Sequence, residues 1–304
     1  MFAQFKSLFE LLRAIPDEQA AIDHFTAIRW RNGAFCPLCG STRVYHFSDN
    51  RTHKCGDCRK RFSIKVGTIF QDTKIPLQKW FMAVWMLTSH KKGIASTTLA
   101  RDIDVTQKTA WFMLHRLRHA AVTESFNAPL DGVVEADQVF VGGKEKNKHA
   151  NKRRAHSSGG SGKIVVLGIL DRDGDCRAEV IPDLSRQSVH PVIREHVAAG
   201  STLITDEHGS FEGLWRHYDR QRVNHAIGEY VRDDVHTNGI ESVWALLKRQ
   251  IIGIHHVVSP KHLHRYLDEM TWRFNRREME EGDRLNNLLA FTDARRLTYR
   301  ELIA

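Results

Sequence analysis

The sequence predicts a small cysteine module and a helical segment, followed by a larger mixed α/β domain. Three observations predict this arrangement. Four cysteines occur in two close pairs, residues 75–125 have helical periodicity, and from residue 130 short apolar strands alternate with helices. A chain of 304 residues, 41% of them hydrophobic, is long enough to form at least one sizeable core.

Residues 1–33 are expected to be mainly helical, because apolar side chains recur on a rough face formed by Phe5, Leu8, Phe9, Leu11 and Leu12. This stretch lacks the basic start, the unbroken apolar segment and the cleavage site of a signal peptide. No apolar run in the chain approaches the ~20 residues that span a bilayer. We therefore expect a soluble, cytoplasmic protein without a membrane partner.

The module at residues 34–67 contains "CPLCG" and "CGDC", two CxxC pairs separated by fifteen residues. This spacing lets Cys36, Cys39, Cys55 and Cys58 bind one tetrahedral Zn²⁺ ion. Two disulfides or a redox-active CxxC are the alternatives, and both suit a reducing compartment less well. Four cysteine ligands leave no open coordination position, so the zinc is expected to be structural. Cys176 lies alone on an expected strand, and we expect it to be a buried thiol.

The chain carries 45 Lys and Arg against 36 Asp and Glu, and this excess favours a polyanionic partner. Part of the positive charge surrounds the cysteines. The basic and aromatic side chains there are Arg43, Tyr45, His46, Arg51, His53, Lys54, Arg59, Lys60 and Arg61. Nucleic-acid binding is the favoured use of such a face, and protein contact is the competing one.

Residues 75–125 contain a pattern typical of a helix-turn-helix. A short helix at Ser96–Asp102 is followed by a tight turn at "DIDVT", and a second helix begins near Thr106. Trp111, Leu114 and Leu117 are the apolar positions of the second helix. We expect this helix to enter a DNA major groove, with Lys108 as a candidate contact.

The α/β domain is expected at residues 130–280. "GVVEADQVFVGG" is a strand, and "KIVVLGILDRDGDCRAEVIPD" is a hairpin that turns at Asp173-Gly174. "SVHPVIREHVAAG" is a helix, "STLITDEHG" a strand, and "QRVNHAIGEYV" a weaker strand. A further helix follows in "HTNGIESVWALLKRQ", and residues 281–304 are expected to form a C-terminal helical tail.

A basic loop, "KEKNKHANKRRAHSSGGSGK", follows the first strand and holds seven Lys or Arg against one Glu. Such loops usually stay solvated. Because this one projects beside a strand that carries an acidic residue, contact with a phosphate backbone is the alternative. The candidates for that contact are Lys152, Arg153 and Arg154.

Three acidic residues stand where an α/β domain brings elements together. Asp137 lies on the first strand, Asp206 at the carboxyl end of a later strand, and Glu241 in the first turn of a helix. Three carboxylates in one site repel one another unless cations are bound, and hard oxygen ligands select Mg²⁺ or Mn²⁺. Two such ions can catalyse displacement at a phosphodiester.

Each of these acids also has a structural interpretation. Glu135 lies on the same strand face as the first aspartate and competes with it. Glu207 directly follows the second aspartate and is its rival. Asn238 and Glu241 have the spacing of a helix capping box, with Asn238 as the cap.

The chain as a whole resembles bacterial insertion-sequence transposases that join an N-terminal zinc ribbon to a DDE, RNase H-like catalytic domain. The resemblance rests on residues that run over nearly the whole length: "CPLCG…CGDCRKRFS", "EADQVFVGGKEKNKH", "LITDEHGSF", "HTNGIESVWALLKR" and "HHVVSPKHLHRYLDEMTWRFNRR". Asp137, Asp206 and Glu241 match the three acidic positions. Lys248 matches a basic residue one to two turns after the glutamate, and with Arg249 is a candidate for DNA contact.

The resemblance implies a mixed sheet flanked by helices and a metal-dependent reaction on DNA. The enzyme would bind transposon terminal repeats, cleave to free 3′-hydroxyls and transfer them to target DNA, acting as a homodimer or higher oligomer. A non-enzymatic DNA-binding regulator derived from a transposase, or a metal nuclease without strand transfer, are the alternatives.

One position departs from the family pattern. The first motif commonly reads Asp-Glu-x-Phe, whereas Gln138 follows Asp137 here. Because neighbouring side chains of a strand point to opposite faces, we expect Gln138 to point away from the site.

Overall fold

The chain divides into two compact units, which are described separately. The computed structural model describes residues 5–49, 51–122, 128–143, 162–224, 227–229 and 231–304, with single residues at 147, 149, 151, 153 and 160. Unit 1 comprises Met1–Val122 and Arg276–Ala304, and unit 2 comprises Thr123–Asn275. Of the helices in the described part of the chain, none has the length and apolar composition that crossing a membrane requires.

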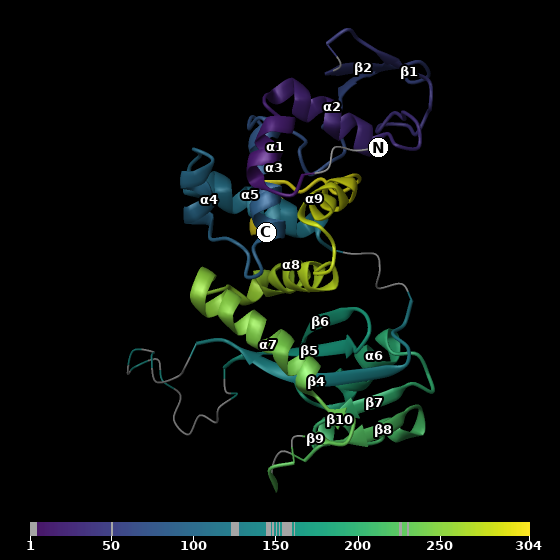
Figure 1. The fold of residues 1–304 in the computed structure, drawn as a ribbon, viewed down its shortest axis with the longest axis vertical. Coiled ribbons are helices and arrows are strands. Elements are labelled where there is room, and N and C mark those ends of the chain that lie inside the picture. The colour runs from purple at the N-terminus through teal and green to yellow at the C-terminus, as the bar shows by residue number, and fades with distance from the viewer. Residues whose placement is uncertain are drawn as a thin grey trace. The chain divides into compact units, whose positions relative to one another are not determined.

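Unit 1 begins with two helices and a small antiparallel sheet (Figure 1). The helices are α1 (Leu8–Ala14) and α2 (Glu18–Arg29), and the strands, in the order β1-β2-β3, are β1 (Val44–His46), β2 (Thr52–Cys55) and β3 (Arg61–Ser63). The expected apolar face of the first helix is only partly buried, because Phe9 is 68% exposed whereas Leu11 is 1% exposed.

The remaining helices of unit 1 include α3, which is buried along most of its length and packs against α2, α5 and α9. They are α3 (Leu77–Ser89), α4 (Ser96–Asp102), α5 (Gln107–Ala120), α9 (Glu281–Ala290) and α10 (Tyr299–Ile303). The C-terminal residues join this unit because α9 packs against α2 and α3. The ion pair between Arg29 and Asp293, with an N–O distance of 2.7 Å, ties the two segments together.

The predicted short helix and the predicted start of the second helix are both confirmed by α4 and α5. Thr106 caps α5, and its side chain accepts a hydrogen bond from Thr109 N. Most of α5 is buried, including Leu114 and Leu117, whereas its first two residues are exposed. Only the N-terminal end of α5 is therefore open to a partner within this unit.

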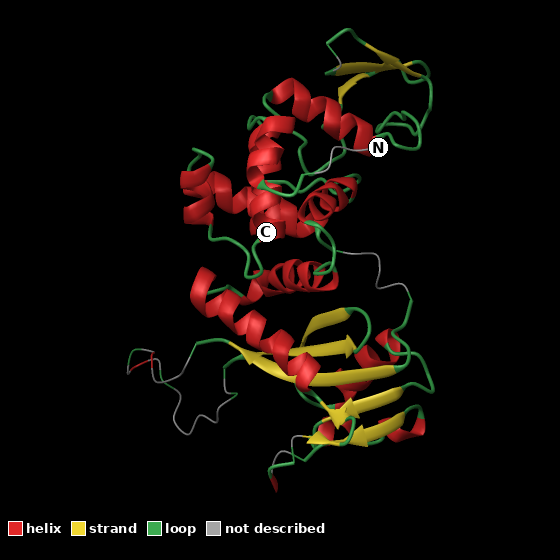
Figure 2. Cartoon of the chain, viewed as in Figure 1, coloured by secondary structure: helices red, strands yellow, loops and turns green. Residues whose placement is uncertain are grey.

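Unit 2 is built on a five-stranded mixed sheet (Figure 2). Its strands, in the order β6-β5-β4-β7-β8, are β4 (Val133–Val141), β5 (Ile164–Asp171), β6 (Cys176–Ile181), β7 (Thr202–Thr205) and β8 (Asp219–Arg222). β5 is antiparallel to β4 and to β6, whereas β7 is parallel to β4 and to β8. A short hairpin of β9 (Val231–Arg232) and β10 (Val235–His236) precedes the next helix.

Helices cover both faces of this sheet. One core packs α6 (Arg186–His196) against side chains such as Val134 and Leu167, and the other packs α7 (Asn238–Gln250) and α8 (Leu263–Asn275) against Val139 and Val166. Short 3₁₀ segments are η4 (Gly209–Phe211), η5 (Leu214–Arg216) and η8 (Pro260–His262), and a π-helical turn, η7 (Ile251–His255), extends α7. The mixed sheet flanked by helices that the sequence implies is confirmed.

Two local predictions differ from the structure. The weaker strand expected at residues 221–231 begins earlier and is shorter, as β8 (Asp219–Arg222). Asn238 is the first residue of α7 rather than its cap, since Thr237 occupies the cap position without a side-chain cap bond. The Asn238–Glu241 capping box is therefore wrong.

Candidate active site

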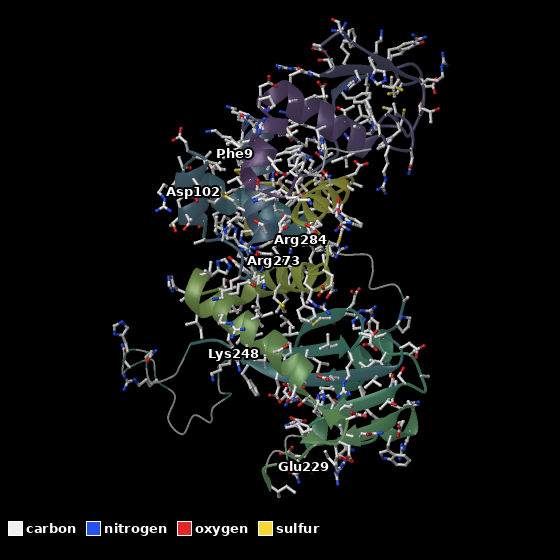
Figure 3. The ribbon with its side chains drawn as sticks, in the orientation of Figure 1. Phe9, Asp102, Glu229, Lys248, Arg273 and Arg284 are labelled. Atoms are coloured by element: carbon white, nitrogen blue, oxygen red, sulfur yellow. The ribbon has the colours of Figure 1, made fainter. Side chains whose placement is uncertain are left out.

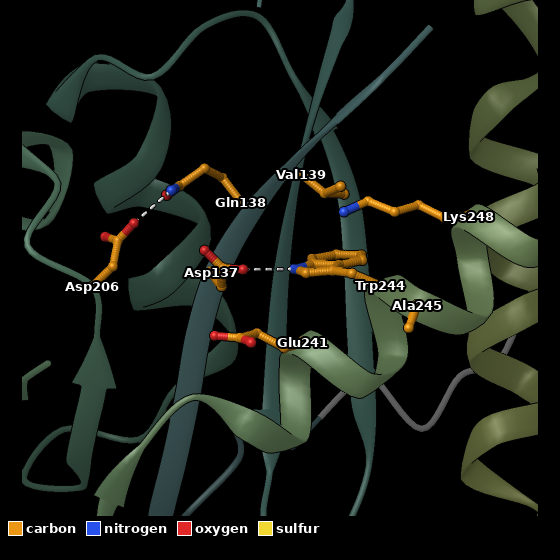
Figure 4. Close-up of a pocket in the computed structure, with 8 residues that line it drawn as sticks. All are labelled: Asp137, Gln138, Val139, Asp206, Glu241, Trp244, Ala245 and Lys248. Atoms are coloured by element: carbon orange, nitrogen blue, oxygen red, sulfur yellow. Dashed lines mark hydrogen bonds between the residues drawn. The ribbon is translucent and has the colours of Figure 1, made fainter. Parts of the chain in front are cut away.

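The three acidic residues singled out in the sequence line one pocket of about 360 Å³ (Figure 4). Asp137 comes from β4, Asp206 follows the end of β7, and Glu241 lies in the first turn of α7. The other lining residues are Gln138, Val139, Trp244, Ala245 and Lys248. Neither Glu135 nor Glu207, the two rival acids, lines this pocket.

The sheet register explains why the two aspartates meet. β4 and β7 are parallel neighbours, and their pairing ends at Ala136 and Thr205. The next residue of each chain segment is an aspartate, so both carboxylates emerge at the same edge of the sheet. Asp137 lies on the strand face covered by α7, which brings Glu241 to the same pocket.

Asp137 is held by the indole of Trp244, whose Nε1 donates a hydrogen bond of 3.0 Å to Oδ2 (Figure 4). The pKa of Asp137 is raised to about 7, mainly by burial and in addition by the nearby charges of Asp206 and Glu241. The hydrogen bond from Trp244 opposes the shift. A bound cation would relieve the same repulsion.

Asp206 receives two hydrogen bonds. Gln138 Nε2 donates to Oδ2 at 2.7 Å, and the backbone N–H of His208 donates to Oδ1 at 2.9 Å. The expectation that Gln138 points away from the site is therefore wrong. Because the pairing with β7 ends at Ala136 and Thr205, no strand in the described part of the chain pairs with this side of β4 at Gln138, and the glutamine side chain extends into the pocket to Asp206.

Glu241 is positioned by the start of its helix. Its backbone N–H donates to Thr237 O, and the Thr237 hydroxyl donates to Glu241 Oε1, both at 3.0 Å. The buried apolar stripe of α7, Ile240, Val243, Trp244 and Leu247, fixes the helix on the sheet. The carboxylate itself lies on the exposed margin of that stripe.

Glu135 anchors the N-terminus of the same helix. Its buried carboxylate accepts a hydrogen bond of 2.9 Å from Ile240 N and pairs with Arg172 Nε at 2.9 Å. A Cβ at position 239 would lie 2.8 Å from Glu135 Oε2, so Gly239 permits this approach. The sequence gives no signal for this role, because only the folded helix places its first turn over β4.

The sequence-derived candidates for DNA contact occupy several places. Lys248 lines the pocket on α7 (Figure 3), and Arg249, the next residue, is exposed. Lys108 is exposed at the start of α5, where its Nζ lies 5.0 Å from the centre of the Tyr299 ring. Arg153 is exposed, and Lys152 and Arg154 lie outside the described residues.

The four paired cysteines form a second cluster, in unit 1. Their sulfur atoms all lie within 4.8 Å of one another, and no other set of three or more His, Cys, Asp or Glu side chains is so tight among the described residues. All five cysteines of the chain are described and none forms a disulfide, so the disulfide alternative is wrong. Cys176 is buried, as expected.

The pKa values of Cys36 and Cys58 are raised by burial and by hydrogen bonds with the other cysteines, and Cys55 is the cysteine whose thiolate form the cluster favours. Burial opposes its charged form, but backbone N–H groups of Cys58 and Asp57 donate to Sγ, both at 3.4 Å, and the pKa of Cys55 falls to about 6. Such a set of sulfur ligands supports a structural zinc ion. Around it the predicted basic side chains are exposed or half-buried, apart from His53, which is buried.

Two family models match the chain: an ISXO2-like transposase domain over residues 129–275 and a transposase zinc-ribbon domain over residues 16–61. An uncharacterized protein in transposable element ISH50 of Halobacterium salinarum is 30% identical over 274 residues, which cover 84% of this chain and 90% of that protein. An uncharacterized transposase-like protein of Haemophilus influenzae is 31% identical over 103 residues, covering 33% of this chain and 81% of that protein.

Among solved structures, the chain is similar to that of a pre-cleavage Mos1 transpososome, with 12% identity, a TM-score of 0.27, and coverage of 72% of this chain and 79% of that one. A TM-score this low carries no argument. The two family models and the ISH50 relative show that the chain belongs to the insertion-sequence transposases that join a zinc ribbon to an ISXO2-like transposase domain.

Proposed function

We propose that this transposase cleaves DNA at transposon ends to free 3′-hydroxyls and transfers them to target DNA. Asp137, Asp206 and Glu241 are the proposed catalytic residues and the ligands of two Mg²⁺ or Mn²⁺ ions. The observation that carries the proposal is the convergence of these three acids, from β4, the loop after β7 and α7, on one pocket.

The donor set suits such ions. All three groups are hard oxygen ligands, and the repulsion that helps to raise the pKa of Asp137 is relieved by positive charge. When bound, two ions activate the attacking oxygen and stabilise the leaving oxygen of a phosphodiester.

The side chains around the acids would hold the DNA. Lys248 adds a positive charge to the pocket, where it can bind a phosphate next to the scissile bond. Arg249 is exposed one residue further along α7 and would contact the adjacent backbone. Neutralising phosphates in this way adds affinity without reading the sequence.

Recognition of the terminal repeats is assigned to unit 1. A recognition helix reads bases mainly with its N-terminal residues, and these are the residues of α5, including Lys108, that are exposed. The basic face of the zinc ribbon would bind the neighbouring backbone. Because two transposon ends must be held together, the active form is proposed to be a homodimer or a higher oligomer.

The experiment that tests the catalytic assignment is Asp137→Asn in the full chain. It should abolish end cleavage and strand transfer while terminal-repeat binding in a gel-shift assay is retained. A variant that still cuts would show that the acids are assigned wrongly.

Strand transfer is tested separately with pre-cleaved ends. Joining of these ends by the wild-type chain supports a transposase. If the chain cuts intact ends but does not join pre-cleaved ends, it is a metal nuclease. If it binds the ends specifically but neither cuts nor joins them, it is a regulator.

A further inference from the structure

We infer that Trp244 is a positioning residue for Asp137 and that Gly168 is the residue that makes room for its indole. The inference rests on the proposed role of Asp137 as a metal ligand. It concerns two residues that contribute no ligand of their own and that sequence patterns mark only as apolar core and as a small residue in a strand.

The indole is a fixed hydrogen-bond donor. Nε1–H can only donate, and here it donates to Asp137 Oδ2 at 3.0 Å (Figure 4). Trp244 is 3% exposed and packs in the core between the sheet and α7. A side chain so confined holds one oxygen of the carboxylate in place and leaves the second oxygen for an ion.

Gly168 creates the space that the ring occupies. It lies directly across from Asp137 in the β4–β5 pairing. A Cβ at this position would lie 2.3 Å and 2.4 Å from Cζ2 and Cη2 of Trp244, and 2.9 Å from Ile240 Cδ1. Because β5 is hydrogen-bonded to a neighbouring strand on each side, it cannot move away, and any residue larger than glycine at position 168 would displace the indole from Asp137.

The position of Trp244 also joins two of the proposed ligands. It follows Glu241 by three residues, so both side chains project from adjacent turns of one helix face. α7 therefore delivers the third carboxylate and, one turn later, the donor that orients the first. When α7 packs correctly on the sheet, it therefore positions both the Glu241 carboxylate and the Trp244 N–H group.

The test is Mn²⁺ binding to the full chain, measured as the loss of the electron paramagnetic resonance signal of the free ion. Trp244→Phe keeps an aromatic ring and removes the N–H, and it should raise the Kd for Mn²⁺ about 10- to 100-fold, the usual effect of removing a hydrogen-bond partner of a ligand. Gly168→Ala keeps every ligand and the donor but displaces the ring, and it should also weaken binding.

Trp272→Phe is the matched control, because Trp272 on α8 is equally buried, at 1% exposure, and does not line the pocket. Its Mn²⁺ affinity should equal that of the wild type. Unchanged affinity in Trp244→Phe would overturn the inference, as would an equal loss in Trp272→Phe, since the effect would then be general destabilisation. Wild-type affinity in Asp137→Asn would instead overturn the proposed metal site, and the inference with it.

Discussion

Gln138 and Asp206 are joined by a hydrogen bond of 2.7 Å from Nε2 to Oδ2, although Gln138 lies on β4 and Asp206 in the loop after β7. A carboxylate can only accept, so the amide nitrogen faces Asp206. The residue that departs from the commoner Asp-Glu-x-Phe pattern thus orients the second aspartate. A glutamate in its place could not donate this bond.

Gln138→Glu should therefore impair cleavage. The change removes the donor and places a second negative charge against Asp206, and we expect the rate of end cleavage to fall about 10- to 100-fold. Gln221→Glu is the matched control, because Gln221 Nε2 donates to Asp219 at 3.3 Å outside the pocket. The control should stay within about twofold of wild type. Equal rates for Gln138→Glu and wild type would contradict the role of Gln138.

Glu135→Ala should destabilise unit 2. The Glu135 side chain is 1% exposed and its partner Arg172 is 22% exposed, so the change leaves a largely buried guanidinium without its carboxylate. It also removes the acceptor of Ile240 N. We expect a loss of about 3 kcal/mol in the free energy of unfolding, near the lower limit for a broken buried pair. Urea unfolding measures it.

Glu229→Ala provides the comparison for that measurement. Its ion pair with Arg232, at 3.2 Å, is partly exposed on both sides, and its loss should cost less than about 1 kcal/mol. Similar losses in both variants would mean that the anchoring of α7 by Glu135 contributes little.

Stability without added divalent metal should decrease as the pH rises toward 7. Burial, with the charges of Asp206 and Glu241, raises the pKa of Asp137 from 3.8 to about 7. Between these values the folded protein retains a proton that the unfolded chain has released, so the free energy of unfolding falls with increasing pH. Asp137→Asn should lack this slope in urea unfolding, and the exposed Asp233→Asn should retain it. A wild-type slope in Asp137→Asn would show that another group is responsible.

The sequence predicts the elements of unit 2 better than the contacts between them. Strand and helix signals place Asp137 on a strand, Asp206 at the carboxyl end of a later strand and Glu241 in the first turn of a helix. The parallel pairing of β4 with β7, which brings the two aspartates together, is seen only in the structure. The roles of Trp244 and Gln138 could not be predicted. The role of Trp244 depends on the space left by the missing side chain at Gly168, and that of Gln138 depends on the residue at which β7 ends.

Helix capping shows a similar limit. The Asn-x-x-Glu spacing predicts a capping box, but in the structure the Thr237 hydroxyl donates to Glu241, and Glu135 from the distant strand β4 accepts from Ile240 N. The C-terminal segment 276–304 was equally unpredictable, because no local signal indicates that α9 packs against α2 and α3.

Removing zinc should unfold the ribbon and abolish recognition of the terminal repeats. Cys55→Ser leaves three sulfur ligands and removes the thiolate whose pKa the backbone N–H groups lower most clearly, so we expect less than one bound zinc per chain and loss of specific DNA binding. Cys176→Ala is the control, because Cys176 is buried in unit 2 and is not a member of the four-cysteine cluster, and this variant should bind zinc as the wild type does. Atomic absorption measures the zinc content, and gel shifts on the same samples measure DNA binding. A Cys55→Ser chain that holds a full equivalent of zinc would contradict the four-cysteine site.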